Sequence, residues 1–222
     1  MPTLILLRHG QASFGTGDYD RLSPTGERQA ALVAEALRDA EDGIVRIVRG
    51  DLRRQRSTAQ PLADATGITP TVDPRWNEYE SGDVLGAHGD AGLSVDAPGA
   101  LDSRAFQGVL DGALRRWIEA GHDSPAAETW PAFHERAAGA FRDALAGLGS
   151  GETAICVTSG GVIAAVCAEL LGGGAELFLR LNRVGVNAGT SRVVRGGGEP
   201  NLITFNEHAP LSAAGRELVT YR

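Results

Sequence analysis

Residues 4–10 read Leu-Ile-Leu-Leu-Arg-His-Gly, and this stretch decides the fold. Its four consecutive apolar residues predict a short buried strand, which ends abruptly in Arg8, His9 and a glycine. In an open α/β sheet, ligands bind at the carboxyl ends of the strands. A basic pair at that place therefore points to an anionic substrate.

Strands alternate with helices along the rest of the chain. Short apolar and β-branched runs predict further strands at residues 44–48, 71–72, 154–157, 184–187, 192–194 and 202–205. Helical periodicity predicts helices after Ser23-Pro24 and at about 55–65, 104–120, 129–148 and 162–171. This alternation predicts an α/β fold, a doubly wound and mostly parallel sheet with helices on both faces. We expect one domain over residues 1–222, with residues 79–127 as a variable insertion over the site.

Composition narrows the classes of partner and chemistry. The net charge of −7 argues against nucleic acid and anionic membranes as partners. All 21 basic residues are arginine, which excludes a P-loop lysine and the lysine Schiff base of pyridoxal phosphate enzymes. Arg8 interrupts the first apolar stretch and no run of 18 apolar residues exists, so we expect a cytoplasmic protein. A homo-oligomer is compatible with the sequence, which carries no signal for one.

Four residues supply the groups that phosphoryl transfer requires. The reaction needs positive donors around the phosphoryl oxygens, an in-line nucleophile and an acid for the leaving oxygen. Arg8 and His9 offer a donor and a nucleophile, Arg54 follows the second predicted strand, and Glu78 follows the third. Because arginines carry the charge, neither a metal nor a cofactor is expected.

These residues and their spacing resemble the histidine phosphatase superfamily, also called the phosphoglycerate-mutase-like family. The matching residues are Arg8, His9 and Gly10, then Leu52, Arg54, Thr58 and Ala59, then Asn77 and Glu78, with Trp76 in place of the family's leucine. The resemblance covers the first eighty residues and residues 154–171. It implies that His9 becomes phosphorylated, that Arg8 and Arg54 hold the phosphate, and that Glu78 protonates the leaving group.

One residue departs from the family's pattern. The family reads Ser-His-Gly-Gly-Val-Ile where residues 158–163 here read Thr-Ser-Gly-Gly-Val-Ile, so Ser159 stands in place of a second histidine donor. Losing such a donor typically costs about a hundred- to thousandfold in rate. Ser159 is the predicted N-cap of a helix, where its hydroxyl and the amides of Gly160 and Gly161 are expected to face an anion.

Other polar residues near these motifs leave alternatives open. Glu80 competes with Glu78 as the acid, and Gln11 and Ser13 are as consistent with phosphate binding as with a structural role. Two further arginines are assigned to a solvated helix face or rim: Arg53 and Arg56. Four histidines outside the motifs are assigned surface or structural roles, with a stand-in for the missing donor left open: His88, His122, His134 and His208.

Two classes of function fit this pattern. The first is a phosphomonoesterase of reduced activity that acts through a phosphohistidine on a small phosphorylated molecule. The second is a non-catalytic domain that binds a phosphorylated ligand. A phosphoglycerate mutase is disfavoured, because it needs a long-lived phosphohistidine in a pocket that has lost one donor.

Overall fold

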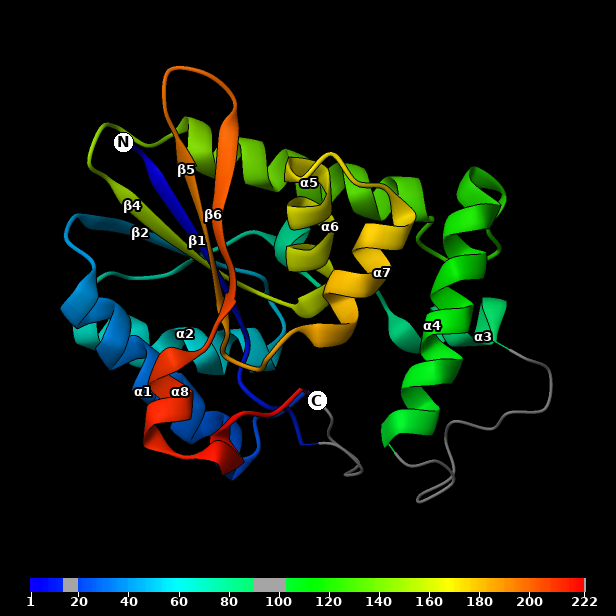
Figure 1. Cartoon of the computed structure of the whole chain (residues 1–222), viewed down its shortest axis with the longest axis horizontal. Coiled ribbons are helices and arrows are strands. Elements are labelled where there is room, and N and C mark those ends of the chain that lie inside the picture. Colours follow the sequence, from blue (N-terminus) through cyan, green and yellow to red (C-terminus); the bar gives the residue numbers. More distant parts are fainter. Residues whose placement is uncertain (14–19, 90–102, 222) are drawn as a thin grey trace.

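A six-stranded mixed sheet forms the centre of the molecule, with strand order β3-β2-β4-β1-β5-β6 (Figure 1). The computed structural model describes residues 1–13, 20–89 and 103–221, and only the backbone of residues 103–106. The strands are β1 Thr3–Arg8, β2 Ile44–Arg49, β3 Thr71–Val72, β4 Thr153–Thr158, β5 Thr190–Arg195 and β6 Pro200–Glu207. Strands β3, β2, β4 and β1 are parallel to one another. Strand β5 pairs antiparallel with β1, and β6 pairs antiparallel with β5. The predicted mostly parallel sheet is confirmed.

Helices connect the strands and pack on the sheet. The α-helices are α1 Pro24–Ala40, α2 Arg53–Thr66, α3 Ser81–His88, α4 Ser103–Ala120, α5 Trp130–Ala146, α6 Gly160–Leu170, α7 Ala175–Val184 and α8 Ala209–Ala214. The 3-10 helices are η1 Pro74–Trp76, η2 Gly121–Asp123 and η3 Arg216–Leu218. Among the described residues, no helix has both the length and the apolarity needed to cross a membrane.

Strand β1 carries apolar side chains on both faces, as a central strand must. Leu4 and Leu6 belong to a core cluster with residues of α3, α4, α5, α6 and α7, whereas Ile5 and Leu7 belong to a second cluster with α1, α2 and α8. Alternate residues of a strand point to opposite faces, so these two clusters lie on opposite sides of the sheet. Figure 1 shows α1, α2 and α8 on the side of the sheet away from α5, α6 and α7. The predicted cover of helices on both faces is confirmed.

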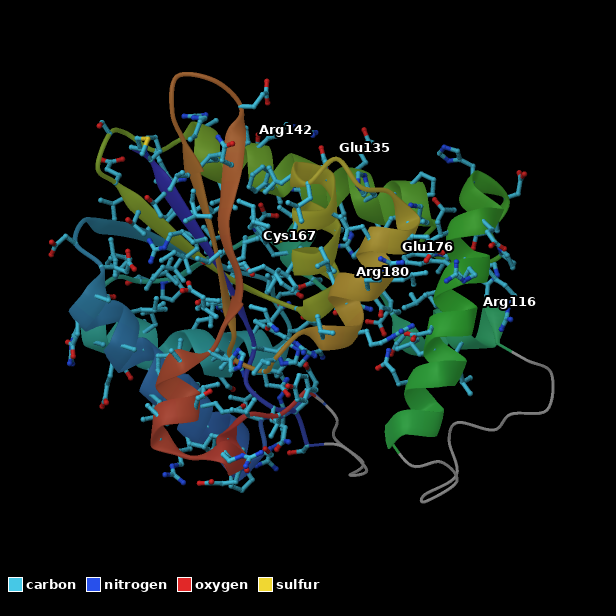
Figure 2. All side chains as sticks on the ribbon, viewed as in Figure 1. Arg116, Glu135, Arg142, Cys167, Glu176 and Arg180 are labelled. Carbon is cyan, nitrogen blue, oxygen red and sulfur yellow. The ribbon has the colours of Figure 1, made fainter. Side chains whose placement is uncertain are left out.

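The strand predicted at residues 184–187 is wrong. Helix α7 runs as far as Val184, and residues 185–187 form a connection to β5. The helix is amphipathic, with Phe178 and Leu179 buried and with Glu176 and Arg180 exposed (Figure 2), so its helical period outweighs the β-branched residues at its end. Helices α3, α7 and α8 were not predicted, because none of them has a side-chain N-cap bond that would mark its start.

Candidate active site

A cavity of about 110 Å³ opens at the carboxyl ends of the central strands. Arg8 pairs with Thr158 and Arg49 pairs with Val157, so β1, β4 and β2 end at nearly the same level. The residues that line the cavity come from five helices and strands and the segments between them: Arg8, His9, Ala12, Arg54, Glu78, Tyr79, Glu80, Ser81, Leu110, Asn182 and Asn187. The structure therefore brings together the predicted nucleophile, both predicted phosphate arginines and the predicted acid.

His9 lies in this cavity as a buried, neutral imidazole. Its Nδ1 lies 2.8 Å from the Gly10 carbonyl oxygen, which only accepts, so Nδ1 carries the proton. Its Nε2 accepts a hydrogen bond of 3.2 Å from the Nε of Arg54. Burial, reinforced by the charges of Arg54 and Arg8, holds the pKa of His9 well below its usual range. The ring therefore keeps a lone pair on Nε2 at neutral pH, as a nucleophile requires.

Two motif residues hold the segment that carries His9 against helices: Thr58 against α2 and Gly10 against α1. The Thr58 hydroxyl accepts from the Gly10 amide at 3.0 Å and donates to the Arg54 carbonyl at 2.7 Å. A Cβ on Gly10 would lie 2.4 Å from the Gly26 carbonyl oxygen at the start of α1. Only glycine fits at this close approach, which explains the residue type that follows His9.

Arg54 is buried at the start of α2 and pairs with an acidic residue that the sequence analysis missed. Its Nη1 lies 2.7 Å from Oδ1 of Asp20, whose Oδ2 accepts from the Arg53 amide at 2.8 Å. Asp20 thus both orients the guanidinium and caps α2, whose own N-cap residue, Leu52, offers no side-chain acceptor. No pattern marks Asp20, because it lies 34 residues before Arg54. Arg53 and Arg56 are exposed, as predicted.

Backbone carbonyls orient the guanidinium of Arg8. Its Nη1 donates to the carbonyl of Gly185 and, at 3.1 Å, to that of Tyr221. The Nε and Cζ atoms lie against Gly160, where a Cβ would come within 3.3 Å of Nε. Gly160, a predicted phosphate-binding residue, therefore packs on a second such residue, Arg8.

Glu78 is half-buried, and the start of helix α6 holds its carboxyl group. Oε2 accepts from the Gly161 amide at 2.9 Å, and Oε1 accepts from the Tyr79 amide at 3.3 Å. Burial raises the pKa of Glu78, although these two amides and the charges of Arg54 and Arg8 act in the opposite direction. A Cβ on Gly161 would lie 2.3 Å from Oε1, so only glycine allows this approach. A raised pKa favours the protonated carboxyl, the form that a general acid uses.

Ser159 occupies the predicted N-cap position of α6, but its hydroxyl makes no hydrogen bond to the helix. The side chain is fully buried, and its Oγ accepts from Nε2 of Gln55 at 3.0 Å. Gln55 Nε2 also donates to the Trp76 carbonyl at 3.1 Å. Ser159 is not among the described residues that line the cavity. Its predicted role as a phosphate donor stays a prediction, and so does that of Gly160.

Gln11 and Ser13 contact the loop that leads into α1. The Gln11 side-chain oxygen accepts from the Ser23 hydroxyl at 2.7 Å, and the Ser13 hydroxyl donates to the Leu22 carbonyl at 3.1 Å. Neither belongs to the described lining of the cavity, so phosphate binding by these two residues stays a prediction. The histidines that were assigned surface or structural roles are also absent from the described lining, and those roles stay predictions: His88, His122, His134 and His208.

Several residues that line the cavity carried no signal in the sequence. Asn182 donates to the Tyr79 hydroxyl at 3.4 Å, and the Oδ1 of buried Asn187 accepts from the Thr220 hydroxyl at 3.0 Å. Leu110 comes from α4, inside the predicted insertion. Residues 90–102 of that insertion lie outside the described residues. Across the described ranges, no three His, Cys, Asp or Glu side chains are grouped so that they could hold a metal ion.

Comparisons with known proteins place these features in one family. Residues 4–208 match the sequence profile of the histidine phosphatase superfamily (branch 1). The chain is 35% identical over 179 residues to a glucosyl-3-phosphoglycerate phosphatase of Mycolicibacterium vanbaalenii, an alignment that covers 76% of this chain and 74% of the relative. It is 39% identical over 88 residues to a probable phosphoglycerate mutase of Yersinia enterocolitica, which covers 37% of this chain and 40% of the relative.

Solved structures agree with this placement. A mycobacterial glucosyl-3-phosphoglycerate phosphatase, solved in complex with VO3, has a TM-score of 0.68 and 26% identity, covering 93% of this chain and 99% of its own. A phosphoserine phosphatase mutant from Entamoeba histolytica, solved with phosphoserine, has a TM-score of 0.68 at 21% identity, covering 95% and 100%. The second likeness concerns the fold alone.

Proposed function

Because the chain belongs to the histidine phosphatase superfamily, we propose that it is a phosphomonoesterase that acts on a small phosphorylated molecule through a phosphohistidine at His9. The observation that carries this proposal is the meeting of three side chains in one cavity: His9, whose Nε2 lies 3.2 Å from Nε of Arg54, and Glu78. Relatives that are named as phosphatases support it.

The first step transfers the phosphoryl group to the enzyme. Arg8 and Arg54 neutralise the phosphoryl oxygens, for which Arg54 turns its Nε donor from His9 to the substrate. Nε2 of His9 then attacks phosphorus, the P–N bond forms, and the bond to the leaving oxygen breaks. The proton of Glu78 passes to that oxygen, and the Gly10 carbonyl steadies the positive charge that develops on the ring.

The second step restores the enzyme. Glu78, now a carboxylate, accepts a proton from a water molecule that attacks phosphorus on the side the leaving group has vacated. The P–N bond breaks, inorganic phosphate forms, and His9 returns to its neutral state. The same two side chains therefore serve both halves of the reaction, and neither step consumes a cofactor.

The position of Ser159 favours reduced activity and keeps a second candidate function in view. Its hydroxyl accepts from Gln55 and is fully buried, and helix α6 carries no cationic side chain. A site without this donor retains phosphate affinity better than it retains turnover, because the donor acts mainly on the transition state. The second candidate is accordingly a domain that binds a phosphorylated ligand without hydrolysing it.

One experiment separates the two functions. Hydrolysis of 4-nitrophenyl phosphate and affinity for inorganic phosphate are measured on the same preparation, and a quenched reaction is analysed for a phosphohistidine. Turnover together with a phosphoryl group on His9 supports the phosphatase. Phosphate affinity without turnover supports the binding domain. A phosphoryl group on another histidine rejects the proposed mechanism.

A further inference from the structure

The segment that carries Glu78 has an irregular backbone held by side chains. Helix η1 ends at Trp76, and no helix or strand follows until α3 begins at Ser81. The carbonyls of four consecutive residues in this segment accept hydrogen bonds from side chains: Arg75, Trp76, Asn77 and Glu78. Backbone polar groups away from water require such partners, and here each partner also fixes the course of the chain.

One side chain, that of Arg136 in helix α5, donates to three of these four carbonyls. Its Nη1 donates to the Arg75 carbonyl at 2.9 Å and to the Asn77 carbonyl at 2.7 Å, and its Nη2 donates to the Glu78 carbonyl at 3.5 Å. The Trp76 carbonyl accepts instead from Gln55 and from the Thr158 hydroxyl.

Arg136 is itself held firmly. Glu128 pairs with it in a bidentate manner, through Nε at 2.5 Å and Nη2 at 2.8 Å. The guanidinium also lies over the Phe133 ring, 4.8 Å from its centre. Only about a fifth of the side chain is exposed. A planar guanidinium with five donors can make all these contacts at once, whereas a lysine ammonium has three donors and no fixed plane.

We propose that Arg136 is a positioning residue for the general acid: it fixes the backbone from which Glu78 reaches the leaving oxygen. This inference rests on the proposed function, because it assigns a role in proton transfer. Arg136 acts through geometry, since Glu128 balances its charge and the cations that bear on the pKa of Glu78 are Arg54 and Arg8. It does not itself touch the substrate.

The dependence of rate on the leaving group tests this role. A phenolate leaving group needs protonation more than the less basic 4-nitrophenolate does, so displacing the acid harms phenyl phosphate more. We expect Arg136→Lys to lower kcat/KM for phenyl phosphate about ten- to hundredfold, the scale of effect expected when a catalytic group is displaced by about 1 Å. The value for 4-nitrophenyl phosphate should fall no more than about threefold.

Two controls separate positioning from a general loss of stability. Arg192→Lys removes a similar part-buried bidentate arginine–glutamate pair, with Glu41, on β5. It should lower kcat/KM for both esters equally or not at all. Glu128→Gln keeps a hydrogen-bond acceptor beside Arg136 but removes the charge of the ion pair. It should shift the leaving-group dependence in the same direction as Arg136→Lys, but by a smaller factor. Vanadate affinity, which reports the arginines and His9, should stay within about twofold in all three variants.

A double variant provides the decisive comparison. In a Glu78→Gln background the acid is already absent, so adding Arg136→Lys should change the ratio of the two kcat/KM values no further. An equal loss on both esters, or a further change in the Glu78→Gln background, would overturn the positioning role. If the native chain hydrolyses neither ester, the proposed function fails. If the native chain hydrolyses both esters and Arg136→Lys behaves like Arg192→Lys, only the positioning role fails.

Discussion

The carboxyl ends of β1 and β4 lie side by side in register, yet they serve the site differently. β1 delivers Arg8 and His9 into the cavity, where both side chains line it. β4 delivers Thr158 and Ser159, both fully buried, whose hydroxyls bond to the Trp76 carbonyl and to Gln55. In the proposed reaction the end of β1 supplies the reacting groups, whereas the end of β4 holds together the segments around it.

Helix α2 contacts both strand ends through consecutive residues. Arg54 donates to His9, and Gln55 donates to Ser159. A residue type at the edge of a sheet therefore does not by itself determine a role in the reaction. His9 lines the cavity while it accepts from Arg54, whereas Ser159, which accepts from Gln55, is not among the described residues that line it.

The largest expected effect falls on the β1 side. His9→Ala removes the nucleophile, which has no substitute, and should lower hydrolysis of an aryl phosphate by at least about a thousandfold. His134→Ala is the matched control, because His134 lies on α5 and pairs with Glu169, and it should leave turnover nearly unchanged. Native turnover in His9→Ala would mean that β1 carries no nucleophile, and the contrast between the strand ends would disappear.

The next effect concerns pH. His9 must be neutral to attack, so kcat/KM should rise as pH increases through its pKa, which burial lowers. Glu78 must be protonated to act as the acid, so kcat/KM should fall as pH increases through its pKa, which burial raises. Glu78→Gln should remove the fall on the alkaline side, keep the rise on the acid side, and cost about a hundredfold with phenyl phosphate. If kcat/KM of Glu78→Gln still falls on the alkaline side, another group is the acid. Glu80→Gln is then the first variant to measure.

Arg54→Ala tests the link between α2 and β1. Charge-assisted hydrogen bonds to phosphate oxygens contribute roughly 1.5 to 3 kcal/mol, so affinity for inorganic phosphate should fall about tenfold or more. Calorimetry measures this directly. Arg53→Ala, an exposed neighbour on the same helix, should alter the affinity little. Equal affinities of the Arg54→Ala variant and the native protein would place the phosphate elsewhere.

The smallest effect is expected on the β4 side. The fully buried Gln55 side chain occupies the space beside the Ser159 hydroxyl, so Ser159→His alone should leave turnover flat or lower it. Ser159→His combined with Gln55→Ala should raise turnover about tenfold over Gln55→Ala, the low end of what one donor contributes. A loss in both Ser159→Ala and Ser159→His, without rescue in the double variant, would show that Ser159 has its own role in the reaction.

Sequence alone predicted the parts of the site that strand ends and local motifs determine. The apolar run before Arg8 and His9 predicted a short strand, and neighbouring strand ends bring Arg54 and Glu78 to the same cavity. The sheet and its two covered faces followed from the alternation of apolar segments. These features depend on residue type at short spacing, which a sequence displays directly.

Contacts between side chains and distant backbone could not be predicted in this way. Asp20 bonds to amides at the start of α2, and Arg136 bonds to carbonyls before α3. Every residue carries the same backbone amide and carbonyl, so the sequence does not indicate which side chain will bond to a given backbone group. The side chain of Ser159 was expected to cap α6, and only the packing of Gln55 against it explains why it does not.

The contact between Arg8 and the Tyr221 carbonyl has a consequence for synthesis of the chain. It joins residues 213 positions apart, and nearby the Leu218 carbonyl accepts from Gln29 at 2.7 Å. β1 also lies between β4 and β5, which emerge from the ribosome long after it. Such long-range closure makes folding slow, because loop entropy is lost before the contacts form. Arg8 and His9 are thus among the first residues to be made, but the strand that carries them cannot take its place in the sheet until β4 and β5 have emerged.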